Sequence, residues 1–352
     1  MVDPLVLKPV YMERIWGGRA LENKYGKSIP EGLIGESWEI SCHPHGMSLI
    51  DNGTFKGWNL QAAIEAQPEE ILGMEIVKTS GTHFPLLVKL LDARETLSVQ
   101  VHPDDAYAAV HEKGELGKTE AWYIIDAKSG ARIVYGTTEG CIRDGFSKAA
   151  REGTLEHCMN WIHVQAGDVL YIPAGMLHAI GDGILICEIQ QNSDTVYRVF
   201  DWNRMDDKGN PRQLQLEKAL DVIDFNGKQR KSILKGVSVK EGTSTREFFV
   251  IGPYFALEVL RVKSEMEEET DASRFFTYSV VSGSCKLEYK DGNVESKAGD
   301  SLLIPAVLGK YRIVGDCVII KAYVPDIKKM KKYLLNKGCT PRQILELAGW
   351  QE

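Results

Sequence analysis

The sequence has few of the features typical of exported, membrane or nucleic-acid-binding proteins. No stretch approaches about 18 consecutive apolar residues, the length that marks a membrane-spanning helix. The first five residues, MVDPL, lack the charged-then-apolar pattern of a secretory signal. Lysine and arginine number 42 against 49 aspartate and glutamate residues, and the net charge of −7 argues against a nucleic-acid-binding surface. We therefore expect a soluble protein with neither membrane nor nucleic acid as a partner.

The sequence also lacks the cysteine spacings that are typical of disulfide frameworks and of zinc sites. The seven cysteines are odd in number, scattered along the chain and form no CxxC pair. This pattern argues against a disulfide framework and against a cysteine-based zinc site, and it fits the reduced thiols of the cytoplasm. We expect a cytoplasmic protein whose metal ligands, if it has any, come from other residue types.

One segment does carry a specific signal, the run GDVLYIPAGMLH at 167–178. Residues 169–172 predict a short buried strand, Pro173 and Gly175 predict a tight turn, and His178 begins the next strand. The spacing resembles the second cupin motif. Because neutral imidazole is the commonest protein metal ligand, we interpret His178 as half of a metal site rather than as a core histidine.

The other half of the site is predicted upstream. In 97–103, LSVQVHP, strict alternation places Gln100 and His102 on one strand face. In a small barrel that face can line a ligand cavity. Glu120 opens a further strand, so Gln100, His102, Glu120 and His178 together offer O, N, O and N ligands. This set suits one zinc ion with a position left for water or substrate.

An internal sequence repeat indicates two related β-units. The segment GDVLYIPA at 167–174 returns as GDSLLIPA at 299–306. Lys310 stands at the position matching His178, so we expect the second unit to lack a metal. The fold class that we expect is mainly β, with two cupin-type jelly-roll barrel units, helical inserts and a C-terminal helical tail.

The same pattern predicts the domain boundaries. We expect a catalytic, metal-binding unit with a helical insert over 1–235, a second cupin-like unit over 240–325 and a helical tail over 326–352. Polar, glycine-containing sequence at 227–242 predicts the linker. Helical patterns are expected at 60–72, 104–113 and 144–160.

The tail has its own amphipathic pattern. Ile327, Met330, Leu334 and Leu335 form an apolar stripe beside several lysines, and Thr340 with Pro341 predicts the start of a second helix. The tail is either a solvated helix packed on the barrel or a basic docking arm.

Three cations lie in strands where unpaired charge is costly. Lys89 is flanked by Leu87 and Leu91, Arg198 alternates with apolar and aromatic residues, and Lys118 lies two positions before Glu120. Each could form a buried salt bridge. Three inward cations beside one metal site are better explained by an anionic substrate bearing phosphate or carboxylate.

These segments together resemble the type I phosphomannose isomerases, in their shorter bacterial branch. The matching strings are PLLVK at 85–89, SVQVHPDD at 98–105, GKTE at 117–120, IPAGMLHA at 172–179 and SDTVYRVFDW at 193–202, with WGG at 16–18 and IGESWEIS at 34–41. The resemblance runs from about Leu7 to about Tyr323. It implies a zinc-dependent interconversion of mannose 6-phosphate and fructose 6-phosphate. It also implies Gln100, His102, Glu120 and His178 as metal ligands, Arg198 as the active-site arginine, and Lys89 and Lys118 in binding or catalysis.

The expected chemistry moves a carbonyl between neighbouring carbons through an enediolate. A divalent metal and cationic side chains would stabilise its negative charge. We assign Arg198 to the enediolate oxygens, and Lys89 with Lys118 to the phosphate, ring opening or proton transfer. The base is left open among Lys118, a hydroxide bound to the metal and a carboxylate beside the ligands.

Two other kinds of function are compatible with a metal-containing cupin. One is a sensor that binds a sugar phosphate, and the other is a different cupin enzyme, such as an iron-dependent dioxygenase or another sugar-phosphate isomerase. A sensor would not need Lys118 and Arg198, and Gln100-Val101-His102 disfavours iron chemistry. Sequence alone leaves the oligomeric state open.

Overall fold

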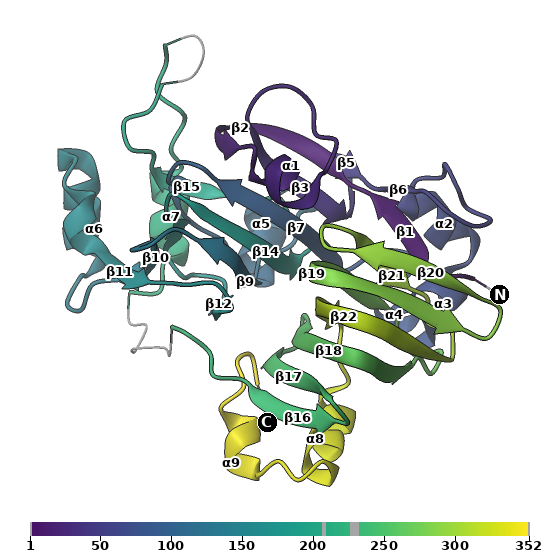
Figure 1. The fold of residues 1–352 in the computed structure, drawn as a ribbon. Helices are drawn as coiled ribbons and strands as arrows, with labels where there is room; N and C mark the ends of the chain where they lie inside the picture. Colours follow the sequence, from purple (N-terminus) through teal and green to yellow (C-terminus); the bar gives the residue numbers. More distant parts are fainter. Residues whose placement is uncertain (1, 206–208, 226–231, 351–352) are drawn as a thin grey trace.

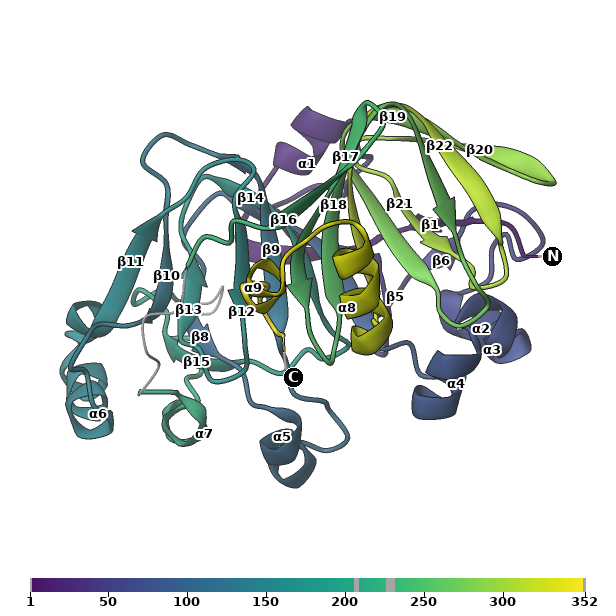
Figure 2. The same cartoon turned by 90° about the horizontal axis from the view of Figure 1, so that it is seen from below.

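A computed structural model describes residues 2–205, 209–225 and 232–350 of the chain. Two β-rich units lie side by side in the ribbon (Figure 1). Strands form most of the regular structure, as predicted, and helices cover the outer parts of the units (Figure 2).

The first unit contains two main sheets. The six-stranded sheet has the order β12-β9-β14-β7-β3-β2, made of Val169–Ile172, Glu120–Ala127, Ile184–Gln191, Leu86–Ala93, Ile34–Ile40 and Val10–Gly18. The five-stranded sheet has the order β11-β10-β13-β8-β15, made of Met159–His163, Arg132–Thr137, His178–Ile180, Val99–Val101 and Tyr197–Phe200. A small ribbon pairs β4 (Cys42–His43) with β5 (Gly46–Met47). The predicted strands before and after the Pro-Gly turn are thus present as β12 and β13.

The second unit is built on one nine-stranded sheet. It contains β16 to β22, which are Val237–Glu241, Ser244–Ile251, Ala256–Glu269, Phe276–Tyr289, Gly292–Lys297, Ser301–Ile304 and Lys310–Tyr323. The strands β1 (Leu5–Lys8) and β6 (Leu49–Ile50) complete it. The N-terminal strand therefore crosses the division that we predicted at 235, and β16 falls inside the predicted linker. Residues 226–231 of that linker lie outside the described part of the chain.

Three long strands of this sheet bend at one line. Ser264 of β18 and Gly283 of β19 have positive φ angles of 85° and 74°, and Gly315 of β22 has a φ of 149°. Gly315 lies opposite Ser264 in the strand pairing, and a Cβ added at Gly283 would lie 2.0 Å from the Asp316 carbonyl oxygen. The two ends of β18 face the same interior as a result. Glu258 near one end and Glu268 near the other both contact Arg246.

Some of the described helices begin at a side chain that caps them. They are α1 (Ala20–Tyr25), α2 (Leu60–Ala66), α3 (Pro68–Ile71), α4 (Met74–Ser80), α5 (Asp105–His111), α6 (Arg143–Glu152), α7 (Leu216–Val222), α8 (Ile327–Asn336), α9 (Pro341–Leu345) and the 3-10 helix Leu155–Cys158. The Asn59 side chain caps α2 and Asp104 caps α5. Pro68 splits the helix expected over 60–72 into α2 and α3 because proline cannot continue a helix.

The tail packs on the second unit. Leu334 of α8 and Ile344 of α9 are buried against Val237 and Phe248 of the sheet. Thr340 forms the expected capping box with Gln343. Leu335 does not join the predicted stripe, since it is 41% exposed. The structure thus agrees with the packed-helix interpretation.

The main core fills the space between the units. The outward face of the six-stranded sheet, including Val88 and Leu90, packs with Leu257 and Ile320 of the second unit. Strand β7 is therefore buried along its whole length, so any charged group on its inward face must find a partner inside the protein.

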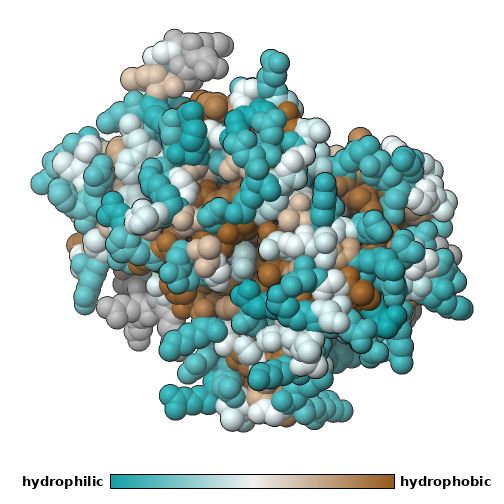
Figure 3. All heavy atoms as spheres, in the orientation of Figure 1, coloured by the Kyte–Doolittle hydropathy of each residue, from teal (hydrophilic) through white to brown (hydrophobic). Residues whose placement is uncertain are grey.

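The surface view shows hydrophilic side chains around the rim and hydrophobic patches nearer the middle of this face (Figure 3). Among the described residues, no helix is both long and apolar enough to cross a membrane.

Candidate metal centre

Strand pairing brings the predicted ligands together. His178 of β13 lies opposite Gln100 of β8, and Gln100 lies opposite Arg198 of β15. Residues opposite each other on antiparallel strands project from the same face, so these three side chains form one row. Glu120, the first residue of β9, belongs to the other sheet. The centre therefore lies between the two sheets of the first unit.

The ligand atoms converge closely. One ligand atom each from His102, Glu120 and His178 lies within 4.8 Å of the others, and all three residues are buried. The Nε2 atoms of His102 and His178 lie 3.6 and 3.3 Å from the carboxylate oxygens of Glu120. This arrangement could hold a metal ion.

Three of the buried atoms at the centre make no hydrogen bond, although Glu120 Oε2 lies 3.3 Å from Lys118 Nζ. His102 Nε2 and both carboxylate oxygens of Glu120 have no hydrogen-bond partner within the described residues. Burying such polar atoms costs free energy unless something binds them. A metal ion would satisfy all of them at once.

Each histidine is oriented by a backbone carbonyl. His102 Nδ1 lies 2.8 Å from the Thr195 oxygen, and His178 Nδ1 lies 2.9 Å from the Met176 oxygen. A carbonyl oxygen only accepts, so each Nδ1 donates its proton and each Nε2 presents a lone pair to the centre. This is the usual arrangement that fixes the tautomer of a metal-binding histidine.

Electrostatics keep both rings neutral. Burial lowers the pKa of His178 to about 4, and burial together with Lys118 lowers the pKa of His102 well below its usual range. A neutral imidazole is the form that binds metals. The two rings are therefore prepared as ligands at neutral pH.

Gln100 completes the predicted set with one difference. Its Nε2 atom lies 3.3 Å from His178 Nε2, so the amide hydrogen faces the ring nitrogen. A 180° turn of the amide group exchanges its oxygen and nitrogen positions. That turn would present an oxygen to a metal bound at this place.

The three predicted cations have different surroundings. Lys118 Nζ lies 3.3 Å from Glu120 Oε2, and Lys89 Nζ lies 3.6 Å from Glu188 and 3.8 Å from Glu36. Burial acts to lower the pKa of Lys118, but Glu120 and Glu188 outweigh it and raise the pKa above its usual range. Lys118 is therefore a cation at neutral pH.

Arg198 has no such carboxylate contact among the described residues. Its Nη1 donates to the Gln213 carbonyl oxygen at 3.0 Å, and its buried Nε has no hydrogen-bond partner in the described chain. Neighbouring Asp201 is already paired with Arg204 and Arg212. Arg198 thus keeps donors available beside Gln100.

Comparison with known proteins now fixes the family. Residues 5–146 match the phosphomannose isomerase type I catalytic domain, and residues 245–324 match the mannose-6-phosphate isomerase cupin domain. The mannose-6-phosphate isomerase of Streptococcus mutans is 38% identical over 323 residues, covering 92% of this chain and 99% of the relative. The chain belongs to the mannose-6-phosphate isomerase family.

Further relatives agree with this family assignment. Mannose-6-phosphate isomerase ManA of Bacillus subtilis is 36% identical over 90% of this chain and 98% of its own length. The crystal structure of the mannose 6-phosphate isomerase from Bacillus subtilis matches with a TM-score of 0.85 at 38% identity, over 91% of this chain and 99% of that chain. A phosphomannose isomerase variant from Salmonella typhimurium shares the fold at 16% identity with a TM-score of 0.73, covering 92% of this chain and 100% of its own. Membership of the family makes this chain an isomerase.

The structure adds two carboxylates that the sequence interpretation missed. Glu188 of β14 lies opposite Lys89 and accepts a hydrogen bond from Trp122 Nε1 at 2.9 Å, while Glu36 of β3 pairs with Arg14 and Lys89. The sequence feature that could have identified both carboxylates is the one that identified Lys89, namely a charged residue inside an apolar strand.

These carboxylates differ in their ionisation. Burial and then Glu120 raise the pKa of Glu188. Burial acts to raise the pKa of Glu36 as well, but Lys89 and Arg14 outweigh it and lower the pKa to about 2. Glu36 is thus the carboxylate whose charged form the site favours, whereas Glu188 is the one whose protonated form it favours.

Proposed function

We propose that this chain is a zinc-dependent isomerase that interconverts mannose 6-phosphate and fructose 6-phosphate through an enediolate. The observation that carries the proposal is the buried set of unsatisfied ligand atoms on His102 and Glu120, beside Lys118 and Arg198, in a chain of this family. The family assignment favours an isomerase over a sensor module or an oxygenase. A cytoplasmic location stays a prediction.

Gln100, His102, Glu120 and His178 would hold the zinc ion. Two nitrogens, a carboxylate and an amide oxygen form a ligand set that suits zinc with a free position. When bound, zinc would act as a Lewis acid toward substrate oxygens. The carbonyls of Thr195 and Met176 keep the histidine rings aimed at the site.

Glu188 is the best candidate for moving the proton between the two sugar carbons. Its Oε2 accepts the hydrogen bond from Trp122 and its Oε1 lies 3.6 Å from Lys89. A carboxylate with a raised pKa can accept and return a proton at working pH. Lys118 is less suited to accept one because it is already protonated, so we propose that it donates to a substrate oxygen.

Arg198 would stabilise the negative charge of the enediolate or of the phosphate. Its guanidinium presents fixed donors, which suit paired oxygens. We keep Lys89 and Lys118 as substrate-binding candidates. The two carboxylates beside Lys89 offset much of its charge.

A coupled assay tests the proposal. Purified protein is mixed with mannose 6-phosphate, fructose 6-phosphate is detected, and the assay is repeated after chelation and after addition of zinc. We expect activity that chelation removes and zinc restores. Substitution Glu188→Gln should abolish turnover while zinc content is kept, and Glu217→Gln on the surface is its control. Absence of isomerisation in the zinc-loaded protein would refute the proposal.

A further inference from the structure

Strand pairing identifies the residues of the second unit that occupy the positions of the metal ligands in the first unit. Strand β12 pairs with β9 so that Ile172 lies opposite Glu120. The echoing strand β21 pairs with β19 so that Ile304 lies opposite Phe276. Phe276 therefore occupies the place of the carboxylate ligand Glu120.

The other ligand positions follow from the next strands. In the first unit His178 lies opposite Gln100, and in the second unit Tyr311 lies opposite Glu268. Tyr311 is buried and Lys310 is exposed. The equivalent of His178 that faces the interior is thus Tyr311, which corrects our prediction of Lys310.

A ring contact supports this alignment. Trp122 and His178 meet at a centroid distance of 5.5 Å, and their counterparts Tyr278 and Tyr311 meet at 6.4 Å. One extra residue between Pro305 and Tyr311 accounts for the shift from the simple sequence echo.

The buried charges are inverted between the units. In the first unit Lys89 lies opposite Glu188 and contacts Glu36. In the second unit the position of Lys89 is taken by Glu258, which lies opposite Lys321. The charge at the position of Glu36 is inverted as well. Glu36 lies opposite Leu91 in the first unit, and Arg246 lies opposite Leu260, the equivalent of Leu91, in the second unit.

An internal cation occupies the centre of the second unit. Lys321 Nζ lies 3.8 Å from the centroid of the Phe276 ring and 2.5 Å from Glu268 Oε2. Arg246 contacts Glu258 at 2.9 Å and Glu241 at 3.2 Å, and it also pairs with Glu268. With two of the metal ligands replaced by Phe276 and Tyr311, this centre is not built for a metal ion.

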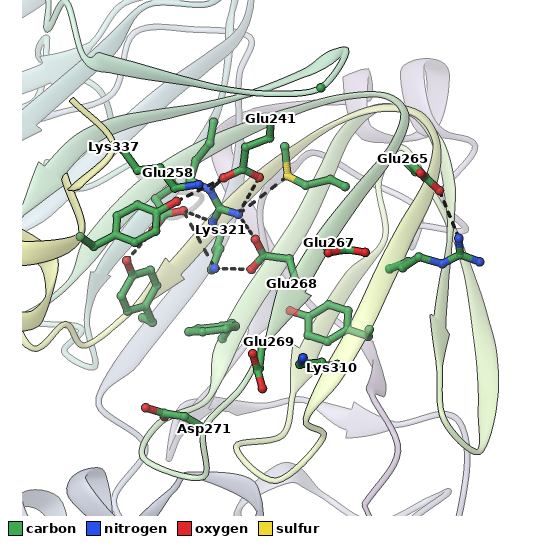
Figure 4. Close-up of a pocket in the computed structure, with 18 of the residues that line it drawn as sticks. Glu241, Glu258, Glu265, Glu267, Glu268, Glu269, Asp271, Lys310, Lys321 and Lys337 are labelled. Atoms are coloured by element: carbon green, nitrogen blue, oxygen red, sulfur yellow. Dashed lines mark hydrogen bonds and ion pairs between the residues drawn. The ribbon is translucent and has the colours of Figure 1, made fainter. Parts of the chain in front are cut away.

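A pocket of about 1540 Å³ opens onto these residues (Figure 4). Eight of the matched or neighbouring side chains line it, namely Glu241, Arg246, Phe248, Glu258, Glu268, Phe276, Tyr311 and Lys321. Tyr323 and, from α8, Tyr333 also line it. The candidate metal centre is not part of this pocket.

The chemistry of the lining defines the class of ligand. The two buried cations, Arg246 and Lys321, are both paired with carboxylates, so neither of them is left to bind an anion. Each carboxylate offers about four acceptor sites, and within the described residues Glu258 accepts hydrogen bonds from Tyr323 and Arg246 and lies 4.0 Å from Lys321 Nζ. Aromatic rings supply apolar faces beside these acceptors. Hydroxyl donors next to C–H faces are what a neutral sugar presents.

We propose that the second unit binds a neutral carbohydrate in this pocket without transforming it. The proposal uses the first unit only as a geometric reference, so it does not depend on the isomerase reaction. Sugar hydroxyls donate to the remaining acceptor sites of Glu241, Glu258 and Glu268, and the sugar rings pack on Tyr333, next to Phe276, one face of which Lys321 covers.

The test measures binding to the full zinc-loaded protein by calorimetry and by saturation-transfer NMR. The probes are mannose and mannotriose, with mannose 6-phosphate as the charged comparison. The variants are Tyr333→Ala and Phe276→Leu in the pocket, His178→Ala in the first unit, and Trp58→Ala as an exposed aromatic control that is 47% exposed.

We expect saturable binding of a neutral sugar that persists in His178→Ala and Trp58→Ala. Tyr333→Ala and Phe276→Leu should weaken it by at least about tenfold, equivalent to about 1.4 kcal/mol, while isomerase activity is unchanged. Thermal melting checks that each variant is folded, and Tyr333→Ala decides the matter if Phe276→Leu does not fold. Failure of both neutral sugars to saturate at millimolar concentrations, or loss of their binding in His178→Ala alone, would overturn the proposal.

Discussion

His102 and Thr195 are joined by a 2.8 Å hydrogen bond between the ring Nδ1 and the backbone oxygen. The bond connects the residue that follows β8 to the segment before β15 and leaves Nε2 pointing at Glu120. Orientation by the backbone means that the ligand geometry exists before a metal arrives. The metal centre is therefore a property of the folded strands and not only of the ligand side chains.

The first prediction concerns metal content. The purified protein should carry about one zinc per chain, and His178→Ala should lose most of it because three ligands hold the ion less tightly than four. Elemental analysis measures both. His45→Ala is the matched control, since that side chain is 64% exposed. Full metal content and activity in His178→Ala would contradict the site assignment.

The second prediction separates catalysis from folding at Arg198. Arg198→Ala should lower kcat by about a hundredfold or more while metal content and Tm stay nearly unchanged, because its free donors act on transition-state charge. Arg198→Lys should recover only part of the loss, since an ammonium lacks the planar fork. Arg342→Ala in the tail serves as control. Early melting with normal specific activity in Arg198→Ala would instead make Arg198 a structural residue.

The third prediction is a pH dependence of the metal-free protein. The pKa of His178 falls from 6.5 to about 4 on folding, so the unfolded chain binds the proton and the folded chain does not. Stability from this group is complete above pH 6.5 and is lost as pH falls toward 4. Tm measured across this range should therefore fall more steeply for the wild type than for His178→Gln. Equal slopes for the two proteins would show that the ring is not held neutral.

The fourth prediction tests the buried ion pairs of β7. Lys89→Met leaves Glu36 and Glu188 without their shared cation and should lower the free energy of unfolding by about 3 to 5 kcal/mol. Adding Glu188→Gln should restore part of that loss, because it removes the carboxylate that has lost its cation, whereas Glu36 keeps its ion pair with Arg14. Urea denaturation of the two variants measures both effects. No recovery in the double variant would argue against direct coupling of Lys89 and Glu188.

The fifth prediction concerns the tail. Leu334 is fully buried against the second unit, and neighbouring Leu335 is 41% exposed. Leu334→Ala should cost about 2 to 5 kcal/mol of stability, whereas Leu335→Ala should cost little. Chemical denaturation compares the pair. Equal small losses would favour a loosely attached arm over a packed helix.

The sequence by itself determined the local parts of this protein. Alternation around Gln100 and His102, and the strand-turn-strand pattern ending at His178, depend on neighbouring residues, so both are legible in one segment. The echo between 167–174 and 299–306 likewise revealed the second unit. These features fixed the fold class and the candidate ligands.

Only the tertiary structure decided how distant strands align. The pairing of Lys89 with Glu188, the joining of β1 to the second sheet, and Tyr311 rather than Lys310 as the counterpart of His178 all depend on strand register. A shift of one residue turns a side chain to the opposite face of a sheet. That choice is made by burial across segments far apart in the chain, and no local pattern records it.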